Sequence, residues 1–171
     1  MLIIGLSGKK QAGKSTAAAH IKKCLENKFN VSVEVVGFAD KLKGIVLDCF
    51  VPPDWNWELA DLEDDDNKNR ETPCGKTVRQ LLQLVGTDWF REAFSDCWVN
   101  ALANTAHSLK TELDVGVLLV PDVRFRNELK YIQANGGLVI RFNRAPFGET
   151  DKHISETALD GVQEHNELLA G

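Results

Sequence analysis

Long apolar runs, excess positive charge and paired cysteine motifs are all missing from this 171-residue sequence. No apolar run approaches the roughly 20 residues of a membrane-spanning helix, and the N-terminus lacks the basic segment of a secretory leader. The net charge of −5 leaves no broad electrostatic footprint for a nucleic acid polymer. We therefore expect a cytoplasmic protein that binds neither a membrane nor a nucleic acid polymer.

The four cysteines, Cys24, Cys49, Cys74 and Cys97, are widely spaced and form no C-x-x-C pair. This spacing favours thiols in a reducing compartment over zinc ligands or disulfides. We find no internal repeat and no interdomain linker. The length and ordinary composition suit one domain, residues 1–171, with a sizeable core.

The most specific motif lies at the N-terminus. The apolar run Leu2–Leu6 predicts a buried strand. The loop that follows, from Gly8 to Ser15, fits G-x-x-x-x-G-K-[ST] at every required position. In such a loop successive N–H groups point into one concavity, which the positive end of the next helix also faces. A glycine-rich turn without a ligand is the alternative. We predict a nucleoside triphosphate site made by Gly8, Lys10, Ala12, Gly13, Lys14, Ser15 and Thr16.

Within that site two side chains have separate predicted roles. Lys14 would reach the β- and γ-phosphates, and the Ser15 hydroxyl would ligate Mg²⁺.

The other apolar segments predict a parallel sheet. A helix that ends near Asn27 follows the loop, and further strands are expected at Val31–Val36, Val115–Val120 and Leu138–Phe142. Strand–helix–strand order implies parallel pairing with right-handed crossovers. The fold class is therefore α/β.

Charged residues follow two of these strands, at the edge where open α/β sheets bind ligands. Asp40 and Lys41 follow the second strand and are candidate contacts to a second substrate, although Asp40 could equally cap a helix that runs to about Phe50. Asp122 follows the third strand and is the expected partner of Mg²⁺ or its water shell. An ion pair between Asp122 and Arg124 is the alternative.

Arginines supply the expected phosphate contacts. Arg124 and Arg126 stand beside Asp122, and a guanidinium offers a fork of donors that matches phosphate oxygens. Arg79 and Arg91 lie in a helical region that starts at Thr77. We expect Gly86 to interrupt this region and Thr87 or Asp88 to cap a second helix, which runs to about Leu109. Its apolar stripe, more typical of a core than of a base-stacking platform, would comprise Phe90, Phe94, Trp98 and Leu102.

Two segments are irregular. Residues 51–76 contain Pro52-Pro53, two tryptophans and an acidic run, and we interpret them as an insertion that could cover a substrate. The acidic run is more typical of a solvated face, so Lys68, Arg70 and Lys76 are its better phosphate candidates. Near the C-terminus His153 is either catalytic or structural, and Ser155–Leu159 begins another predicted helix.

With these blocks in place, the chain resembles the bacteriophage-type deoxynucleoside monophosphate kinases. The resemblance rests on GLSGKKQAGKST from Gly5, FADKLK from Phe38, RQLLQLVGTDWFRE from Arg79, VPDVRFRNE from Val120 and HISE from His153. It implies a P-loop kinase fold, a three-layer α/β/α sandwich whose central parallel sheet has four to five strands. The short C-terminus puts the fifth strand in doubt.

The resemblance also implies an activity: transfer of the ATP γ-phosphoryl group to a deoxynucleoside 5′-monophosphate for deoxynucleotide synthesis, with Mg²⁺ as cofactor. Lys14, Asp122 and Arg126 are the catalytic candidates, with Ser15 and Asp122 at the metal. The substrate-binding candidates are Asp40, Lys41, Arg79, Gln83, Arg91, Arg124 and Glu128. Related enzymes make a homodimer plausible.

Two other functions fit parts of the sequence. A different small-molecule P-loop kinase, resembling phosphomevalonate or dephospho-coenzyme A kinases, would share the loop and the strand-end aspartate. A regulatory nucleotide-binding switch is disfavoured because the chain has no guanine-reading N-K-x-D sequence.

Overall fold

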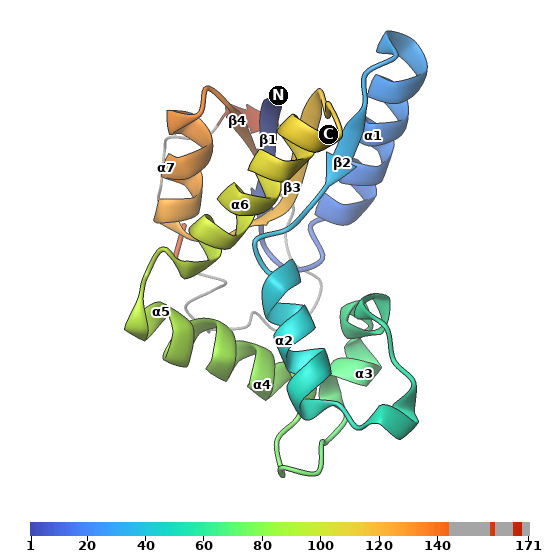
Figure 1. The fold of residues 1–171 in the computed structure, drawn as a ribbon, viewed down its shortest axis with the longest axis vertical. Helices are drawn as coiled ribbons and strands as arrows, with labels where there is room; N and C mark the ends of the chain where they lie inside the picture. The colour runs from blue at the N-terminus through green and yellow to red at the C-terminus, as the bar shows by residue number, and fades with distance from the viewer. Residues whose placement is uncertain (144–157, 160–165, 169–171) are drawn as a thin grey trace. The chain divides into compact units, whose positions relative to one another are not determined.

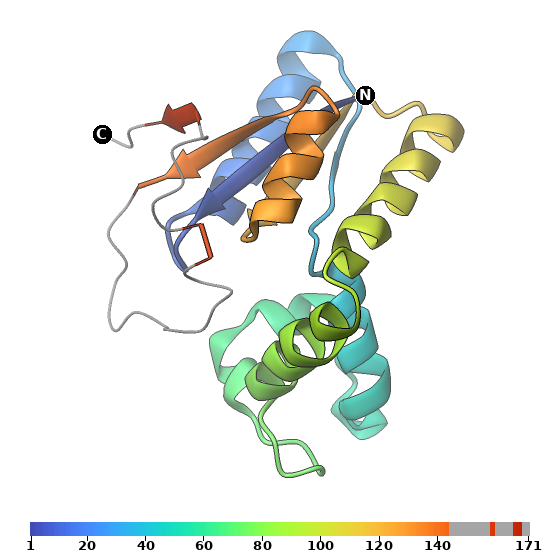
Figure 2. The ribbon, with the colours of Figure 1, turned by 90° about the vertical axis from the view of Figure 1, so that its left-hand side faces the viewer.

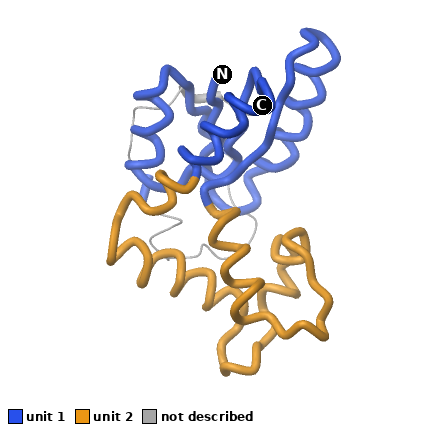
Figure 3. Tube along the Cα trace, viewed as in Figure 1, with its two compact units in different colours: residues 1–38, 102–171 blue, residues 39–101 orange. Residues whose placement is uncertain are grey.

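A computed structural model describes residues 1–143, 158–159 and 166–168. The chain divides into two compact units, which are treated separately below (Figure 3). Unit 1 comprises residues 1–38 and 102–171, and unit 2 comprises residues 39–101. The expected insertion, residues 51–76, falls inside unit 2.

Unit 1 is built on a parallel sheet, as predicted. Within the described residues the sheet has five strands in the order β2-β3-β1-β4-β5, every neighbouring pair parallel. Strands β1 to β4 are labelled in Figure 1. The strands are β1 (Leu2–Gly8), β2 (Val33–Val35), β3 (Val117–Val123), β4 (Leu138–Phe142) and β5 (Asn166–Leu168). The doubtful fifth strand therefore forms, although it is only three residues long.

Helices cover both faces of this sheet, which gives the predicted sandwich (Figure 2). On one face Ile4 and Leu6 of β1 pack with Ala18 of α1 (Lys14–Phe29) in a buried cluster. On the other face α7 (Arg126–Ala134) approaches so closely that a Cβ on Gly5 would lie 2.7 Å from Ile132 Cδ1. Glycine in the middle of β1 therefore permits close helix–sheet packing.

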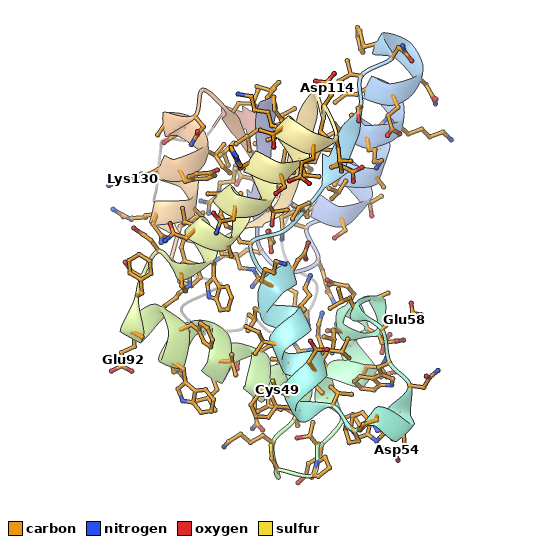
Figure 4. All side chains as sticks on the ribbon, in the orientation of Figure 1. Cys49, Asp54, Glu58, Glu92, Asp114 and Lys130 are labelled. Atoms are coloured by element: carbon orange, nitrogen blue, oxygen red, sulfur yellow. The ribbon has the colours of Figure 1, made fainter. Side chains whose placement is uncertain are left out.

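The helix α7 shows the expected amphipathic pattern. Leu129 and Ile132 are buried against the sheet. Lys130, between them in sequence, extends outward from the helix (Figure 4).

The strand β3 extends past its predicted end at Val120. Its pairing with β1 shifts register between Gly5, which pairs with Val120, and Ser7, which pairs with Val123. Pro121 lies in this irregularity and has no N–H for a ladder bond, so a bulge is the expected local solution. As a result Asp122 is held inside the end of a strand and not in the following loop.

Unit 2 is helical where a long loop was expected. After α2 (Asp40–Phe50) come the 3₁₀ turns η1 (Pro53–Trp55) and η2 (Leu59–Glu63), then the short helix α3 (Asp65–Asn69). Asp64 accepts the Asn67 N–H and so caps α3, while the guanidinium of Arg70 lies 3.7 Å from the Trp55 ring. The acidic run thus makes specific contacts within the unit, while Glu63, Asp64 and Asp66 remain exposed, as predicted for a solvated face.

The following helices correct two predictions. Thr77 and Gln80 form a reciprocal capping box at α4 (Val78–Gln83), and Gly86 then lies inside a π-helical stretch, η3 (Leu84–Trp89), that continues into α5 (Phe90–Ala93). No cap at Thr87 or Asp88 is needed because the backbone stays helical. The chain turns extended at Phe94, before α6 (Cys97–Glu112).

The predicted apolar stripe is therefore split between two helices. Trp98 and Leu102 of α6 are buried, but Phe90 and Phe94 are 38% and 51% exposed. Periodicity along the sequence could not reveal the break, because all four residues are apolar at helical spacing.

Three further predictions concern absences and the C-terminus. The four cysteines are free thiols. None of the helices in the described residues is long and apolar enough to cross a membrane. The predicted helix at Ser155–Leu159 lies largely outside the described residues, of which Ala158 and Leu159 are in a turn.

Candidate active site

The loop after β1 has the backbone that its glycines predict. Gly8 and Gly13 have φ angles of +140° and +92°, and Gly13 immediately precedes the first residue of α1. A side chain on Gly8 would also meet the carbonyl oxygen of Phe142 at 2.7 Å. Only glycine enters this conformation without strain. The loop therefore curls tightly into the start of α1.

Lys14, the first residue of α1, folds back over this loop. Its ammonium group donates to the carbonyl oxygens of Gly8 and Lys9, both at 2.8 Å. These bonds hold the charge beside the loop and the positive end of the helix dipole. Ser15 and Thr16 follow with exposed side chains, whereas Ala12 is buried and Lys10 is half-buried.

Asp122 is positioned by the backbone that follows β2. Its Oδ1 accepts the N–H of Phe38 at 2.8 Å, and a Cβ on Gly37 would lie 2.7 Å from its Oδ2. Both carboxylate oxygens are therefore close to this backbone. The side chain remains partly accessible, as a metal-binding role requires.

Beyond β3, Glu128 organises the turn into α7. It is 1% exposed, and its Oε2 accepts the N–H groups of Arg124 (2.7 Å) and Phe125 (3.0 Å). These bonds satisfy backbone donors at a helix start. The observed contacts give Glu128 a structural role, and its substrate contact stays a prediction.

We expect Glu128→Ala to destabilise the fold by about 2–3 kcal/mol, because two backbone N–H groups lose their acceptor. Urea denaturation with an unchanged m value would measure the loss. Glu128→Gln keeps an acceptor oxygen and should lose less. Equal stability of the Ala variant and the wild type would contradict the proposed cap.

The other candidates of unit 1 are the two arginines around this turn. Arg124 is half-buried, and Arg126 is exposed as the first residue of α7. Within the described residues Arg126 makes no ion pair or hydrogen bond through its side chain. The strands β1 and β3 are parallel neighbours, and α1 and α7 follow them in the chain. Both helices therefore begin beyond the carboxyl ends of the strands, at the same edge of the sheet.

The remaining candidates belong to unit 2. Asp40 is the first residue of α2, after Ala39 at the cap position, and accepts a 3.0 Å bond from Lys43. Of the two alternatives weighed from the sequence, a cap at Asp40 is not observed, because Ala39 holds the cap position and Asp40 is the first helical residue. Lys41 is exposed, Gln83 ends α4 half-buried, and Arg91 of α5 donates to the Ser95 carbonyl at 3.3 Å.

Arg79 has partners that the sequence did not indicate. It donates through Nη2 to Asp65 (2.8 Å) and through Nε to Asn69 (3.1 Å), both on α3. From the sequence the acidic residues were interpreted as more typical of a solvated face, and no local signal assigns a partner ten or more positions away.

A separate ion cluster of unit 2 joins α2 to η2. Glu63 contacts Lys43 at 2.5 Å and Lys68 at 3.6 Å. Burial raises the pKa of Glu63, but the two ammonium groups outweigh this and leave the pKa below its ordinary value. Burial lowers the pKa of Lys68, against the attraction of Glu63 and Asp65. The ammonium group of Lys68 already pairs with Glu63 in this cluster. Its suggested phosphate role remains a prediction.

Comparison with known proteins identifies the family of this chain. A family model described as "Deoxynucleotide monophosphate kinase" matches residues 57–169, more than half of the chain. The chain belongs to the deoxynucleotide monophosphate kinase family. A protein of Acanthamoeba polyphaga mimivirus named "Putative deoxynucleotide monophosphate kinase" is 29% identical over 99% of this chain and 88% of its own length.

Membership of the deoxynucleotide monophosphate kinase family confirms the resemblance inferred from the sequence. The matched range begins after the Gly8–Ser15 loop, so the loop geometry is separate support for a phosphate-binding protein. His153 lies outside the described residues. The structure groups Lys14, Asp122, Arg124 and Arg126 in unit 1, and Asp40, Lys41, Arg79, Gln83 and Arg91 in unit 2.

Proposed function

We propose that this family member transfers the γ-phosphoryl group of ATP to a deoxynucleoside 5′-monophosphate, giving the diphosphate and ADP. The observation that carries the proposal is the placement of positive charge at helix starts. α1 begins with Lys14 and α7 with Arg126, and both starts lie beyond one edge of the sheet.

Cations are unfavourable at these positions because a helix N-terminus already carries partial positive charge. α1 has no acidic residue in its first turn, and the Glu128 carboxylate of α7 is taken up by backbone N–H groups. An anion bound at this edge would relieve the repulsion. A triphosphate, with several negative charges, suits both helix starts and the Gly8–Ser15 loop.

The chain's own residues would act by alignment and charge neutralisation. A nucleoside monophosphate supplies its own anionic oxygen, so no strong general base is required. Lys14 would hold the β- and γ-phosphates, and Arg126 would stabilise charge on the transferring phosphoryl group. Arg79, Arg91 and Arg124 would bind the monophosphate, with Asp40 and Lys41 at its sugar or phosphate and Gln83 and Glu128 as further contacts.

The metal candidates fit a magnesium ion of the phosphoryl-transfer type. Ser15 presents an exposed hydroxyl and Asp122 a carboxylate held beside Gly37, both hard oxygen ligands. In the described residues no three His, Cys, Asp or Glu side chains gather as a metal cage. A bound Mg²⁺ would supply positive charge that offsets the charge developing on the phosphates.

An acceptor panel tests the proposal directly. ADP release should be measured with ATP, Mg²⁺ and each of dAMP, dGMP, dCMP and dTMP, then with ribonucleotides, phosphomevalonate and dephospho-coenzyme A. We expect turnover with at least one deoxynucleoside monophosphate. Turnover with only a non-nucleotide acceptor would favour the other small-molecule kinases, and slow hydrolysis without any acceptor would favour a switch.

Arg126→Ala separates function from stability. Because Arg126 lies at a positive helix end without a described partner, its removal should leave thermal stability unchanged or slightly higher. Turnover should fall by about 10²–10³-fold, the size of effect expected for a transition-state cation. The exposed Lys130→Ala on the same helix is the charge-matched control. Full activity of Arg126→Ala would remove this residue from the mechanism.

A further inference from the structure

The five-residue helix α3 holds Arg79 by one edge of its guanidinium. Asp65 and Asn69 stand four positions apart, so their side chains lie on one face of the helix. The carboxylate takes Nη2–H at 2.8 Å and the amide oxygen takes Nε–H at 3.1 Å. Two different side chains therefore occupy the edge that a single carboxylate often binds alone.

The other end of this guanidinium stays available. Of its five N–H donors, the two on Nη1 and one on Nη2 have no partner in the part of the chain that the structure describes. The side chain is 28% exposed, so a ligand can reach it. These three donors form the fork that matches two oxygens of a phosphate or carboxylate.

Stability alone does not account for the contact between Arg79 and Asp65. Arg79 and Asp65 are both partly exposed, at 28% and 44%, and such pairs add little to stability. Holding a flexible arginine in advance, however, lowers the ordering cost when an anion binds.

We propose that Asp65 and Asn69 are positioning residues, which orient Arg79 so that its open Nη1 end receives the 5′-phosphate of the acceptor nucleotide. This inference rests on the proposed function. The three residues all lie within the range matched by the family model. The α3 segment therefore contributes indirectly to substrate recognition.

Binding of the monophosphates and steady-state kinetics test this on the full chain. Calorimetry should compare the wild type with Asp65→Ala, Asp65→Asn and Asn69→Ala, using dAMP, dGMP, dCMP and dTMP. We expect Asp65→Ala to raise Kd and KM for the monophosphate about three- to tenfold, with kcat within about twofold and KM for ATP unchanged. Asn69→Ala should act in the same direction with a smaller effect.

Two comparisons separate positioning from charge. Removing a carboxylate near an anion site should tighten anion binding if only charge matters, so the expected weakening has the opposite sign. Asp65→Asn keeps an oxygen for Nη2–H and should restore wild-type affinity or better. Asp66→Ala, an equal charge change on the exposed neighbouring residue, is the matched control.

Several results would overturn the inference. Tighter monophosphate binding in Asp65→Ala, or equal effects of Asp65→Ala and Asp66→Ala, would show a purely electrostatic role. If Asp65→Ala lowers the melting temperature but leaves the Kd for the monophosphate unchanged, the contact only stabilises the fold. If the wild type binds a monophosphate without phosphorylating it, the proposed function fails while the Kd comparison still decides this point. If it binds none, both are rejected.

Discussion

Lys14→Ala should lose about 10³-fold or more in turnover while the protein remains folded. The ammonium lies at the start of α1 beside the Gly8 and Lys9 carbonyls, where the phosphates of a triphosphate would bind. Removing a cation aimed at a transferring phosphoryl group commonly costs several kcal/mol of transition-state stabilisation, and each 1.36 kcal/mol is about tenfold in rate. Single-turnover kinetics with saturating ATP would measure the loss in the chemical step.

The fold should tolerate this change because the lost bonds go to partly exposed carbonyl groups that water can satisfy. Lys23→Ala is the matched control: the same helix loses the same charge at an exposed position. It should keep wild-type turnover. Near-normal kinase activity in Lys14→Ala would reject the assignment of the loop as the donor site.

Gly37→Ala should reduce turnover at least tenfold, although residue 37 carries no chemistry. The new Cβ would lie 2.7 Å from Asp122 Oδ2, closer than real Cβ atoms approach, and the neighbour is a carboxylate fixed by the Phe38 N–H. The carboxylate must move away from its present position. Since alignment within a fraction of an ångström matters in phosphoryl transfer, the variant should imitate much of the loss in Asp122→Ala.

Measurement of kcat against Mg²⁺ concentration distinguishes this from a general loss of structure. A displaced metal-binding carboxylate should raise the Mg²⁺ concentration needed for half-maximal rate. Gly44→Ala in α2 is the control, because a Cβ there meets nothing within 4 Å and helix propensity favours alanine by about 0.5–1 kcal/mol. An unchanged Mg²⁺ dependence of kcat in Gly37→Ala would contradict the assignment of Asp122 as a metal ligand.

Local patterns in the sequence were sufficient for most of unit 1. The loop at Gly8–Ser15 could be located because its motif fixes residue types at adjacent positions, and the strand Leu138–Phe142 was predicted with its observed bounds. Apolar strands between helical segments leave few arrangements other than a parallel sheet.

Unit 2 was harder because non-local contacts decide its local structure. Gly86 looked like a helix breaker, yet it lies in a π-helical stretch where a Cβ would meet Leu42 at 2.5 Å and where its carbonyl accepts the Trp98 indole N–H at 2.8 Å. These partners are far from Gly86 in sequence. Propensity alone therefore placed a cap and a new helix where the backbone continues.

The sequence by itself determined the α/β class, the glycine loop at the start of α1 and the family, because these depend on short motifs and on the order of apolar segments. Only the tertiary structure decided how the charged residues are held. The Asp122 carboxylate meets a backbone N–H 84 positions away, and Arg79 meets Asp65 across 14 positions. Such pairings follow from how strands and helices pack, and hydrogen-bond geometry at those distances leaves no periodic trace in the chain.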